Sequence, residues 1–225
     1  MSELRIVYKD KDVVIIEKPV GMPSQSDTTG DIDAMSATSE LLLASGENST
    51  LFLIHRLDRV VGGLIAFARN KRAAAELSRT VSEGEMKKLY FAICHGKIAE
   101  PCELRDFLYK DSAAGKAYVI STDRRGAKEA RLTHTPLAYS EADATLLSVS
   151  LATGRFHQIR VQLSSRAHPL IGDKKYGSRD ARTRTPALFA HKLEFTLFGR
   201  EISVSATPDI TAYPWNLFDE EKYRS

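Results

Sequence analysis

Short apolar runs separated by turn residues recur along this chain of 225 residues and restrict what it can fold into. None of these runs approaches the ~20 apolar residues that a membrane-spanning helix needs. Runs of this length bounded by glycine, proline or charged residues predict β-strands. We expect strands at residues 5–9, 13–18, 51–54, 64–68, 88–95, 145–151, 188–198 and 201–206.

Helical patterns lie between these strands, at residues 38–44, 71–82 and 156–165. Asn70 is a favoured N-cap for the second helix. The spacing of apolar residues predicts the faces that turn to the core. These are Leu41 and Leu42 in the first helix, Ala73, Ala74, Leu77 and Val81 in the second, and Phe156, Ile159 and Leu163 in the third.

The remaining stretches are predicted to be a loop at residues 24–36 and a hairpin excursion at residues 100–130. Strands and helices therefore follow one another in mixed order, with several hairpins. This order predicts an α+β fold with a largely antiparallel sheet and flanking helices. The length allows one large domain, and we expect a single catalytic domain over residues 1–225.

Charge is unevenly distributed along the chain. Residues 1–50 hold four Lys or Arg against nine Asp or Glu, whereas residues 155–184 hold eight Lys or Arg against two Asp. A basic block of this kind is expected where a protein binds a phosphate backbone. Lys174 and Lys175 lie within it. A solvated surface without a partner is the alternative interpretation.

The cysteine content and the N-terminus indicate the compartment. Cys94 and Cys102 are the only cysteines, which fits a reducing environment better than a disulfide framework. Residues 1–5 lack a basic region followed by an apolar block, so we expect no signal peptide. The sequence therefore predicts a cytoplasmic protein without a membrane segment.

One carboxylate, Asp58, lies between Arg56 and Arg59 in the sequence. In an extended segment, alternation would place Arg56 and Asp58 on one face. Opposite charges nearby favour the ionised carboxylate, which can act as a nucleophile. The alternative is a structural Arg–Asp pair that pins a turn. Gly62-Gly63, just beyond, would let a ligand or another strand approach closely.

Two other segments carry candidate functional groups. Residues 155–160 would open the third helix, where free N–H groups favour anions, and His157 and Arg160 would present cations from one face. Tyr90 lies in a predicted strand on the same face as Lys88, and an aromatic there can stack on a base. Ordinary surface cations and a half-buried strand tyrosine are the alternatives.

Familiar cofactor motifs are absent from the sequence. The six histidines are scattered, without HExxH or paired CxxC, and there is no Walker loop, GxGxxG or GxSxG. The chain thus offers an acid, cations and an aromatic. We expect neither a metal nor a cofactor.

Four ordered blocks resemble the RluA-type pseudouridine synthases. His55-Arg56-Leu57-Asp58 followed by Gly63-Leu64 resembles the HRLDxxTSGL signature of that family. Residues 17–21 resemble its KPxG block, residues 87–96 its KxYxAxxxG block, and residues 154–177 its GRxHQIRVHL…HPLxGDxxYG block. The resemblance spans about residues 5–206. The chain departs from the family pattern at Val61-Gly62, where Thr-Ser is usual, and at Gln162 and Phe189, where histidine is usual.

The resemblance implies isomerisation of a uridine in an RNA stem-loop, ribosomal or transfer RNA, to pseudouridine without a cofactor. Asp58 would be the nucleophile that helps to detach uracil from C1′, by attack on the sugar or through a glycal. Tyr90 would stack on the base and assist proton removal, and Arg160 would pair with Asp58. Arg56 would fill the space that the flipped uridine leaves. The other residues expected to bind substrate are Arg155, His157, Lys174 and Lys175.

A base must leave its stack for this chemistry, which costs a few kcal/mol and can be offset by phosphate contacts and stacking. We expect a monomer without an upstream S4 domain. Two other functions remain open: an inactive RNA-binding or RNA-folding protein on the same fold, and a carboxylate hydrolase such as a nucleosidase. Residues 24–50 and 103–130 are candidates for choosing the RNA target.

Overall fold

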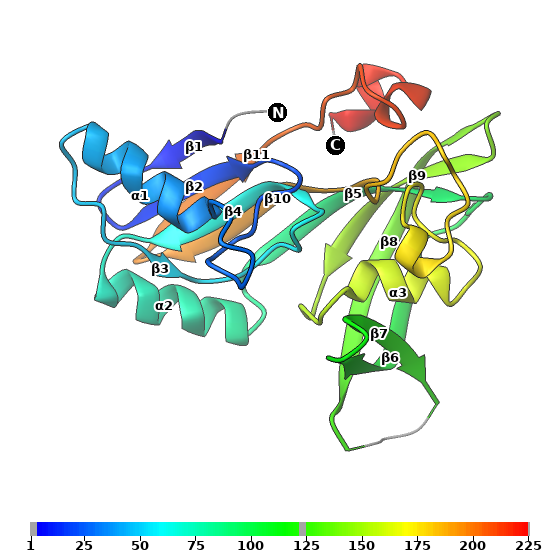
Figure 1. The fold of residues 1–225 in the computed structure, drawn as a ribbon, viewed down its shortest axis with the longest axis horizontal. Helices are drawn as coiled ribbons and strands as arrows, with labels where there is room; N and C mark the ends of the chain where they lie inside the picture. The colour runs from blue at the N-terminus through cyan, green and yellow to red at the C-terminus, as the bar shows by residue number, and fades with distance from the viewer. Residues whose placement is uncertain (1–3, 122–124, 225) are drawn as a thin grey trace. The chain divides into compact units, whose positions relative to one another are not determined.

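The computed structural model describes residues 4–121 and 125–224 (Figure 1). Its chain divides into two compact units, the first formed by Met1–Lys88 with Ala190–Ala206 and the second by Leu89–Phe189 with Thr207–Ser225. The expected absence of a signal peptide rests partly on residues 1–3, and the expected excursion includes residues 122–124. Both parts lie outside the described residues. A single catalytic domain over residues 1–225 stays a prediction.

The first unit contains a sheet in the order β1-β2-β4-β10-β11, with β3 beside β4. The β1–β2, β2–β4, β3–β4 and β10–β11 pairs are antiparallel. Every residue of β4 is buried, so both of its faces are covered, because successive side chains point to opposite sides. The strands are β1 Arg5–Lys9, β2 Val13–Lys18, β3 Phe52–Leu53, β4 Gly62–Ala68, β10 Leu188–Leu197 and β11 Arg200–Ser205.

The helix α2, Lys71–Ser82, begins where the sequence predicts. The Asn70 side chain accepts a hydrogen bond from the Ala73 N–H at 2.9 Å, which satisfies one of the free amides of the first turn. Ala73 and Leu77 are buried as expected. Thr80 rather than Val81 completes the buried stripe.

The helix α1, Ala34–Ala44, begins four residues before the predicted start. Asp33 is its N-cap, and its carboxylate accepts from the Ser36 N–H at 3.0 Å. The polar residues before the helix had indicated a loop and concealed this cap. Leu42 is buried, whereas Leu41 is 44% exposed, so the expectation that both face inward is wrong. Neighbouring residues of a helix are about 100° apart and point in different directions.

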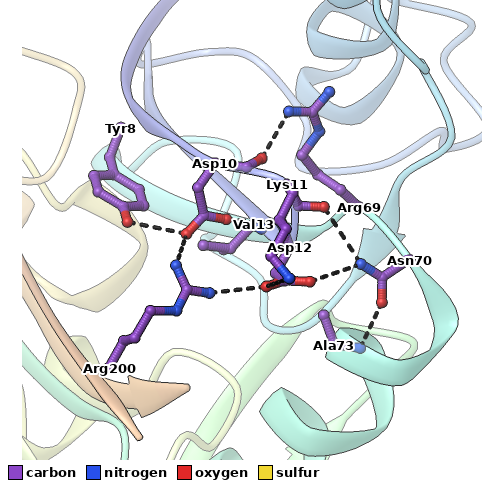
Figure 2. A network of polar contacts seen from close by, with 9 residues as sticks. All are labelled: Tyr8, Asp10, Lys11, Asp12, Val13, Arg69, Asn70, Ala73 and Arg200. Carbon is purple, nitrogen blue, oxygen red and sulfur yellow. Dashed lines mark hydrogen bonds and ion pairs between the residues drawn. The ribbon is translucent and has the colours of Figure 1, made fainter. Parts of the chain in front are cut away.

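A polar network joins three turns of the first unit (Figure 2). Asp10, in the turn between β1 and β2, accepts from the Tyr8 hydroxyl at 3.0 Å and from Arg200 at 2.6 Å. Asp12 accepts from Arg200 at 2.8 Å and from the Asn70 amide at 3.0 Å. The network therefore ties the β1–β2 turn to the start of α2 and to the β10–β11 hairpin.

The second unit contains a sheet in the order β5-β9-β8-β6-β7, in which each of these neighbouring pairs is antiparallel. The strands are β5 Lys87–His95, β6 Cys102–Asp111, β7 Lys116–Ile120, β8 Ala127–Ser140 and β9 Ala144–Leu151. The β6–β7 hairpin confirms the predicted excursion in its described part. Together with the first unit, these pairings confirm an α+β fold with a largely antiparallel sheet.

The helix α3, Gln158–Ser164, packs against β6 and β7 (Figure 1). It is shorter than the predicted helix at residues 156–165, because His157 has a left-handed backbone with φ 55° and stands outside it as the N-cap. Every residue from 158 to 163 is buried. The expectation that His157 and Arg160 share one face of this helix is therefore wrong, because His157 precedes the helix; a role of the two residues in a cleft stays a prediction.

Short 3₁₀ segments complete the second unit: η1 Lys174–Tyr176, η2 Trp215–Leu217 and η3 Glu220–Tyr223. Tyr223 and Trp215 pack on Phe91 and Ile93 of β5, and so close one core of this unit. Within the described parts of the chain, no helix combines the length and the apolar character that crossing a membrane requires.

Candidate active site

Asp58 lies on the irregular segment that connects β3 to β4. The strand expected at residues 51–54 covers only Phe52–Leu53, and residues 54–58 belong to no strand. Asp58 begins a turn, in which its carbonyl accepts from the Val61 N–H at 2.9 Å. The residue is partly exposed to solvent.

The two arginines beside Asp58 differ in their surroundings. The Arg59 guanidinium donates to the Gly21 carbonyl at 2.9 Å and to the Thr29 hydroxyl at 3.1 Å, and it also binds the Asp31 carboxylate. Arg56 is exposed. Arg59 therefore holds the loop after β2, whereas Arg56 is open to a ligand.

Lys18, at the end of β2, was not among the predicted site residues. Its side chain is only 1% exposed, and its ammonium donates to the carbonyls of Pro19 at 2.9 Å, Met22 at 2.7 Å and Arg59 at 3.3 Å. Burial lowers the Lys18 pKa to about 8, while the charge of Asp58 acts to raise it. A buried cation thus lies within electrostatic range of Asp58. The sequence did contain a signal for Lys18: a lysine at the end of an apolar strand, directly before a proline.

His55 and Gly63 have structural environments. The His55 imidazole accepts from the Ala66 N–H at 3.1 Å, and burial, with the charge of Lys88, lowers its pKa to about 3. Gly63 has φ +112°, and a Cβ there would lie 2.3 Å from the Ala190 carbonyl oxygen. The sequence left two explanations for the Gly62-Gly63 pair, the close approach of a ligand or of another strand. At Gly63 the structure shows the close approach of another strand.

Tyr90 lies in β5, opposite Val149 of β9. Only 7% of Tyr90 is exposed, so it is buried more deeply than the half-buried tyrosine that was the alternative expected from the sequence. Alternation along β5 places it on the same face as Lys88, as the sequence predicts. Burial lowers the pKa of the Lys88 ammonium.

Arg160 forms a buried ion pair with Asp173. Its Nε donates to Oδ2 of Asp173 at 2.6 Å and its Nη2 to Oδ1 at 2.9 Å, and the two side chains are 5% and 1% exposed. The Tyr176 ring lies 5.1 Å from the guanidinium carbon. Sequence reasoning missed Asp173 as a partner, although it stands in the last of the four blocks. The fixed fork of two bonds holds the guanidinium in one orientation.

His157 is uncharged in this setting. Its Nδ1 lies 2.8 Å from the Tyr176 hydroxyl, which accepts from the Ala117 N–H at 2.8 Å. The tautomer of His157 decides which of these two groups donates the hydrogen bond. Burial, followed by the charge of Arg160 and nearby lysines, lowers the His157 pKa to about 3. The residue does not supply the positive charge that the sequence suggested.

The other predicted RNA contacts are exposed. Arg155 donates from Nε to the Glu129 carbonyl at 2.8 Å, and Lys175 donates to the Gly115 carbonyl at 2.9 Å. Lys174 is exposed beside it in η1. The basic segment is partly neutralised, because three of its arginines form ion pairs: Arg160 with Asp173, Arg166 with Asp106 and Arg182 with Asp180.

The departures from the family pattern occupy packed positions. Val61 is buried, and Phe189 is buried with its ring centroid 6.5 Å from that of Trp215. Gln162 is buried and donates to Asp106 at 2.7 Å, while its carbonyl oxygen has no partner among residues 4–121 and 125–224. In the same residues, no three His, Cys, Asp or Glu side chains are grouped to hold a metal ion.

Comparisons with known proteins relate this chain to one family. Residues 12–165 match the family model described as RNA pseudouridylate synthase. An uncharacterized RNA pseudouridine synthase of Bacillus subtilis is 32% identical over 86% of this chain, and the match covers 64% of that relative's length. The chain thus spans less than two thirds of this relative.

Two other relatives have more specific names. A ribosomal large subunit pseudouridine synthase C of Rickettsia conorii is 28% identical over 89% of this chain and 67% of its own length. A tRNA pseudouridine synthase C of Haemophilus ducreyi is 32% identical over 78% of this chain and 74% of its own. For the fold, human RNA pseudouridylate synthase domain containing 1 aligns with TM-score 0.78 and 23% identity, over 95% of this chain and 86% of that one.

Proposed function

Because the chain belongs to the RNA pseudouridylate synthase family, we propose that it isomerises uridine within RNA to pseudouridine. One observation carries this proposal. Asp58 stands in the family's His-Arg-Leu-Asp block, partly exposed at the start of a turn and within electrostatic range of the buried Lys18 ammonium. A nearby cation favours the anionic carboxylate that the reaction needs.

The reaction exchanges one glycosidic bond for another. The bond between C1′ and N1 breaks, the uracil turns, and a bond forms between C1′ and C5. C5 then loses its proton and N1 gains one, so nothing is consumed and no cofactor is required. The Asp58 carboxylate acts as the nucleophile that attacks C1′. On the alternative route through a glycal, a base removes the C2′ proton as the C1′–N1 bond breaks, and C2′ regains a proton when the bond between C1′ and C5 forms.

Tyr90 and Arg160 complete the proposed catalytic trio. Tyr90 stacks on the target base and assists proton removal, and Arg160 pairs with the Asp58 carboxylate. These roles are supported by the family blocks in which the two residues stand. The bidentate bond to Asp173 supports an oriented guanidinium at Arg160.

RNA is the proposed partner, and the cytoplasm the proposed place of action. The exposed cations Arg56, Arg155, Lys174 and Lys175 contact phosphates or the vacated base position, and His157 contributes to RNA binding as a neutral group. The names of the relatives support a ribosomal or transfer RNA stem-loop as the substrate. We propose that the protein acts as a monomer.

The test compares Asp58→Asn with wild-type protein on total RNA from cells that lack the protein. Asp58→Asn should abolish pseudouridine formation, because an amide is a poor nucleophile. Asp143→Asn is the matched control: Asp143 is exposed, has φ 55°, and lies on the β8–β9 turn, where asparagine is well tolerated. Pseudouridine would be mapped by base-specific chemistry.

Three results would contradict the proposal in different ways. Wild-type activity in Asp58→Asn would remove Asp58 from the mechanism. Salt-sensitive RNA binding by the wild-type protein without isomerisation of any RNA would favour an RNA-folding protein on the same fold. Release of free uracil would identify a nucleosidase instead.

A further inference from the structure

The residue before Asp58 is held by a single buried hydroxyl. The Ser24 Oγ donates to the Leu57 carbonyl at 2.8 Å and accepts from the Leu57 N–H at 3.0 Å. A serine hydroxyl can donate one hydrogen bond and accept others, so both contacts are compatible. Ser24 and Leu57 are both buried. Ser24 thus satisfies both backbone groups of Leu57 where no neighbouring strand does so.

The residue after Asp58 is held by the same loop. The Gly21 N–H donates to the Arg59 carbonyl at 2.8 Å, and the Arg59 Nε donates back to the Gly21 carbonyl at 2.9 Å. Lys18 adds a third bond, from its ammonium to the Arg59 carbonyl at 3.3 Å. Gly21 has φ +92°, a left-handed conformation that glycine adopts without strain.

Asp58 is therefore held on both sides by one short segment. Residues 54–58 belong to no strand, so a β-ladder does not restrain the backbone here. The bond to the Leu57 carbonyl restricts the peptide plane before Asp58, and the bond from the Val61 N–H to the Asp58 carbonyl restricts the plane after it. The bonds to the Arg59 carbonyl hold the next peptide plane along the chain, so the backbone on both sides limits the direction of the Asp58 Cα–Cβ bond.

We propose that Lys18, Gly21 and Ser24 form a clamp that positions Asp58 for reaction, with Ser24 as its decisive positioning residue. The inference rests on the proposed function, in which Asp58 is the nucleophile. Ser24 is buried and bonded to backbone, so the clamp acts through Asp58 rather than through RNA. A nucleophile displaced by about 1 Å can lose on the order of 100-fold in rate.

Ser24→Ala removes both bonds to Leu57. We expect the single-turnover rate of pseudouridine formation at saturating protein to fall by roughly 10-fold or more. The dissociation constant for the same RNA should stay within twofold of wild type. The probe is total RNA from cells that lack the protein, and the melting temperature is measured in parallel.

The matched control is Ser39→Ala. The Ser39 hydroxyl also donates to a backbone carbonyl, that of Ser49 at 2.7 Å, in the same unit and without a bond to residues 57–59. This variant should keep the wild-type rate even where its melting temperature falls. A merely structural role of Ser24 would move the melting temperature and leave the rate at saturation unchanged.

A second variant decides the question if Ser24→Ala does not fold. Arg59→Gln removes the bond from Nε to Gly21 at a partly exposed residue, and should slow the same step without destroying the fold. Its control is Arg79→Gln, an exposed arginine that pairs with acids on and after α2.

The outcomes separate this inference from the proposed function. If Asp58→Asn is inactive and Ser24→Ala reacts within twofold of the wild-type rate, the clamp is rejected and the proposed function stands. A change confined to the RNA dissociation constant also rejects it. If Ser24→Ala does not fold, a wild-type rate in Arg59→Gln likewise rejects the clamp. Full activity in Asp58→Asn overturns both proposals.

Discussion

Arg160 of α3 and Asp173, which precedes η1, form a bidentate ion pair with almost no contact to solvent. The two residues are thirteen positions apart, and the chain between them returns to bring the carboxylate to the guanidinium. Both charges have been removed from water, so each depends on the other. The pair therefore fixes an arginine of the proposed catalytic trio through an aspartate outside it.

Replacing Asp173 by asparagine should leave the Arg160 charge buried and incompletely paired. Breaking a buried pair by removal of one partner typically destabilises a protein by about 3–5 kcal/mol. We expect a loss of this size in the free energy of unfolding, measured by urea titration. The exposed Asp143→Asn serves as the control, and a loss below about 1 kcal/mol in Asp173→Asn would show that the pair adds little to stability.

The exposed lysines of η1 can be tested by salt dependence. Each lysine that contacts a phosphate releases about one counterion, so Lys174→Glu with Lys175→Glu should weaken RNA binding and flatten the plot of log affinity against log salt. Lys71→Glu with Lys222→Glu makes the same change in net charge at exposed positions elsewhere. If the plot of log affinity against log salt has the same slope in the two double variants, the η1 lysines do not contact the RNA backbone.

The network around Asp10 predicts an acid-dependent loss of stability. Burial acts to raise the Asp10 pKa, but hydrogen bonds from the backbone of Asp12 and Val13 and from Arg200 and Tyr8 lower it below its ordinary value. The folded chain therefore releases this proton more readily than the unfolded chain. The stabilisation is fully present above the unfolded pKa and is lost as the pH falls through the folded one.

Asp10→Asn should remove this part of the acid dependence and lower the free energy of unfolding at pH 7 by about 1–3 kcal/mol. The measurement is urea unfolding at several pH values between 2 and 7. Glu40→Gln, at an exposed carboxylate of α1, should keep the wild-type profile. If the free energy of unfolding depends on pH in Asp10→Asn as it does in the wild-type protein, other groups cause the acid sensitivity.

Gly63 offers a test of close strand packing. A Cβ there would overlap the Ala190 backbone, whereas a Cβ at Gly84, which also has positive φ, would meet nothing within 4 Å. Gly84→Ala therefore carries only the left-handed strain, of about 1–2 kcal/mol. Gly63→Ala should lower the melting temperature considerably more, because β4 and β10 must also move apart. Equal shifts in the two variants would contradict this packing argument.

Local patterns in the sequence were sufficient for most of the strands and for α2. Apolar runs such as residues 13–16 and the Asn70 cap are local signals, because burial and capping depend on neighbouring residues. The family blocks likewise indicated Asp58, Tyr90 and Arg160, whose proposed roles await the tests above. The same local rules failed at α3, where a left-handed His157 delays the helix and polar residues are buried among apolar ones.

Tertiary structure alone decided which groups meet. The Arg59 guanidinium turns to the loop after β2, the Lys18 ammonium lies buried against the Arg59 carbonyl, and Arg160 finds Asp173. A charge in a sequence has many possible partners, and the path of the backbone selects one by bringing it within hydrogen-bond distance. Periodicity reports which side of an element is covered, and it contains no information about the distant residue that covers it.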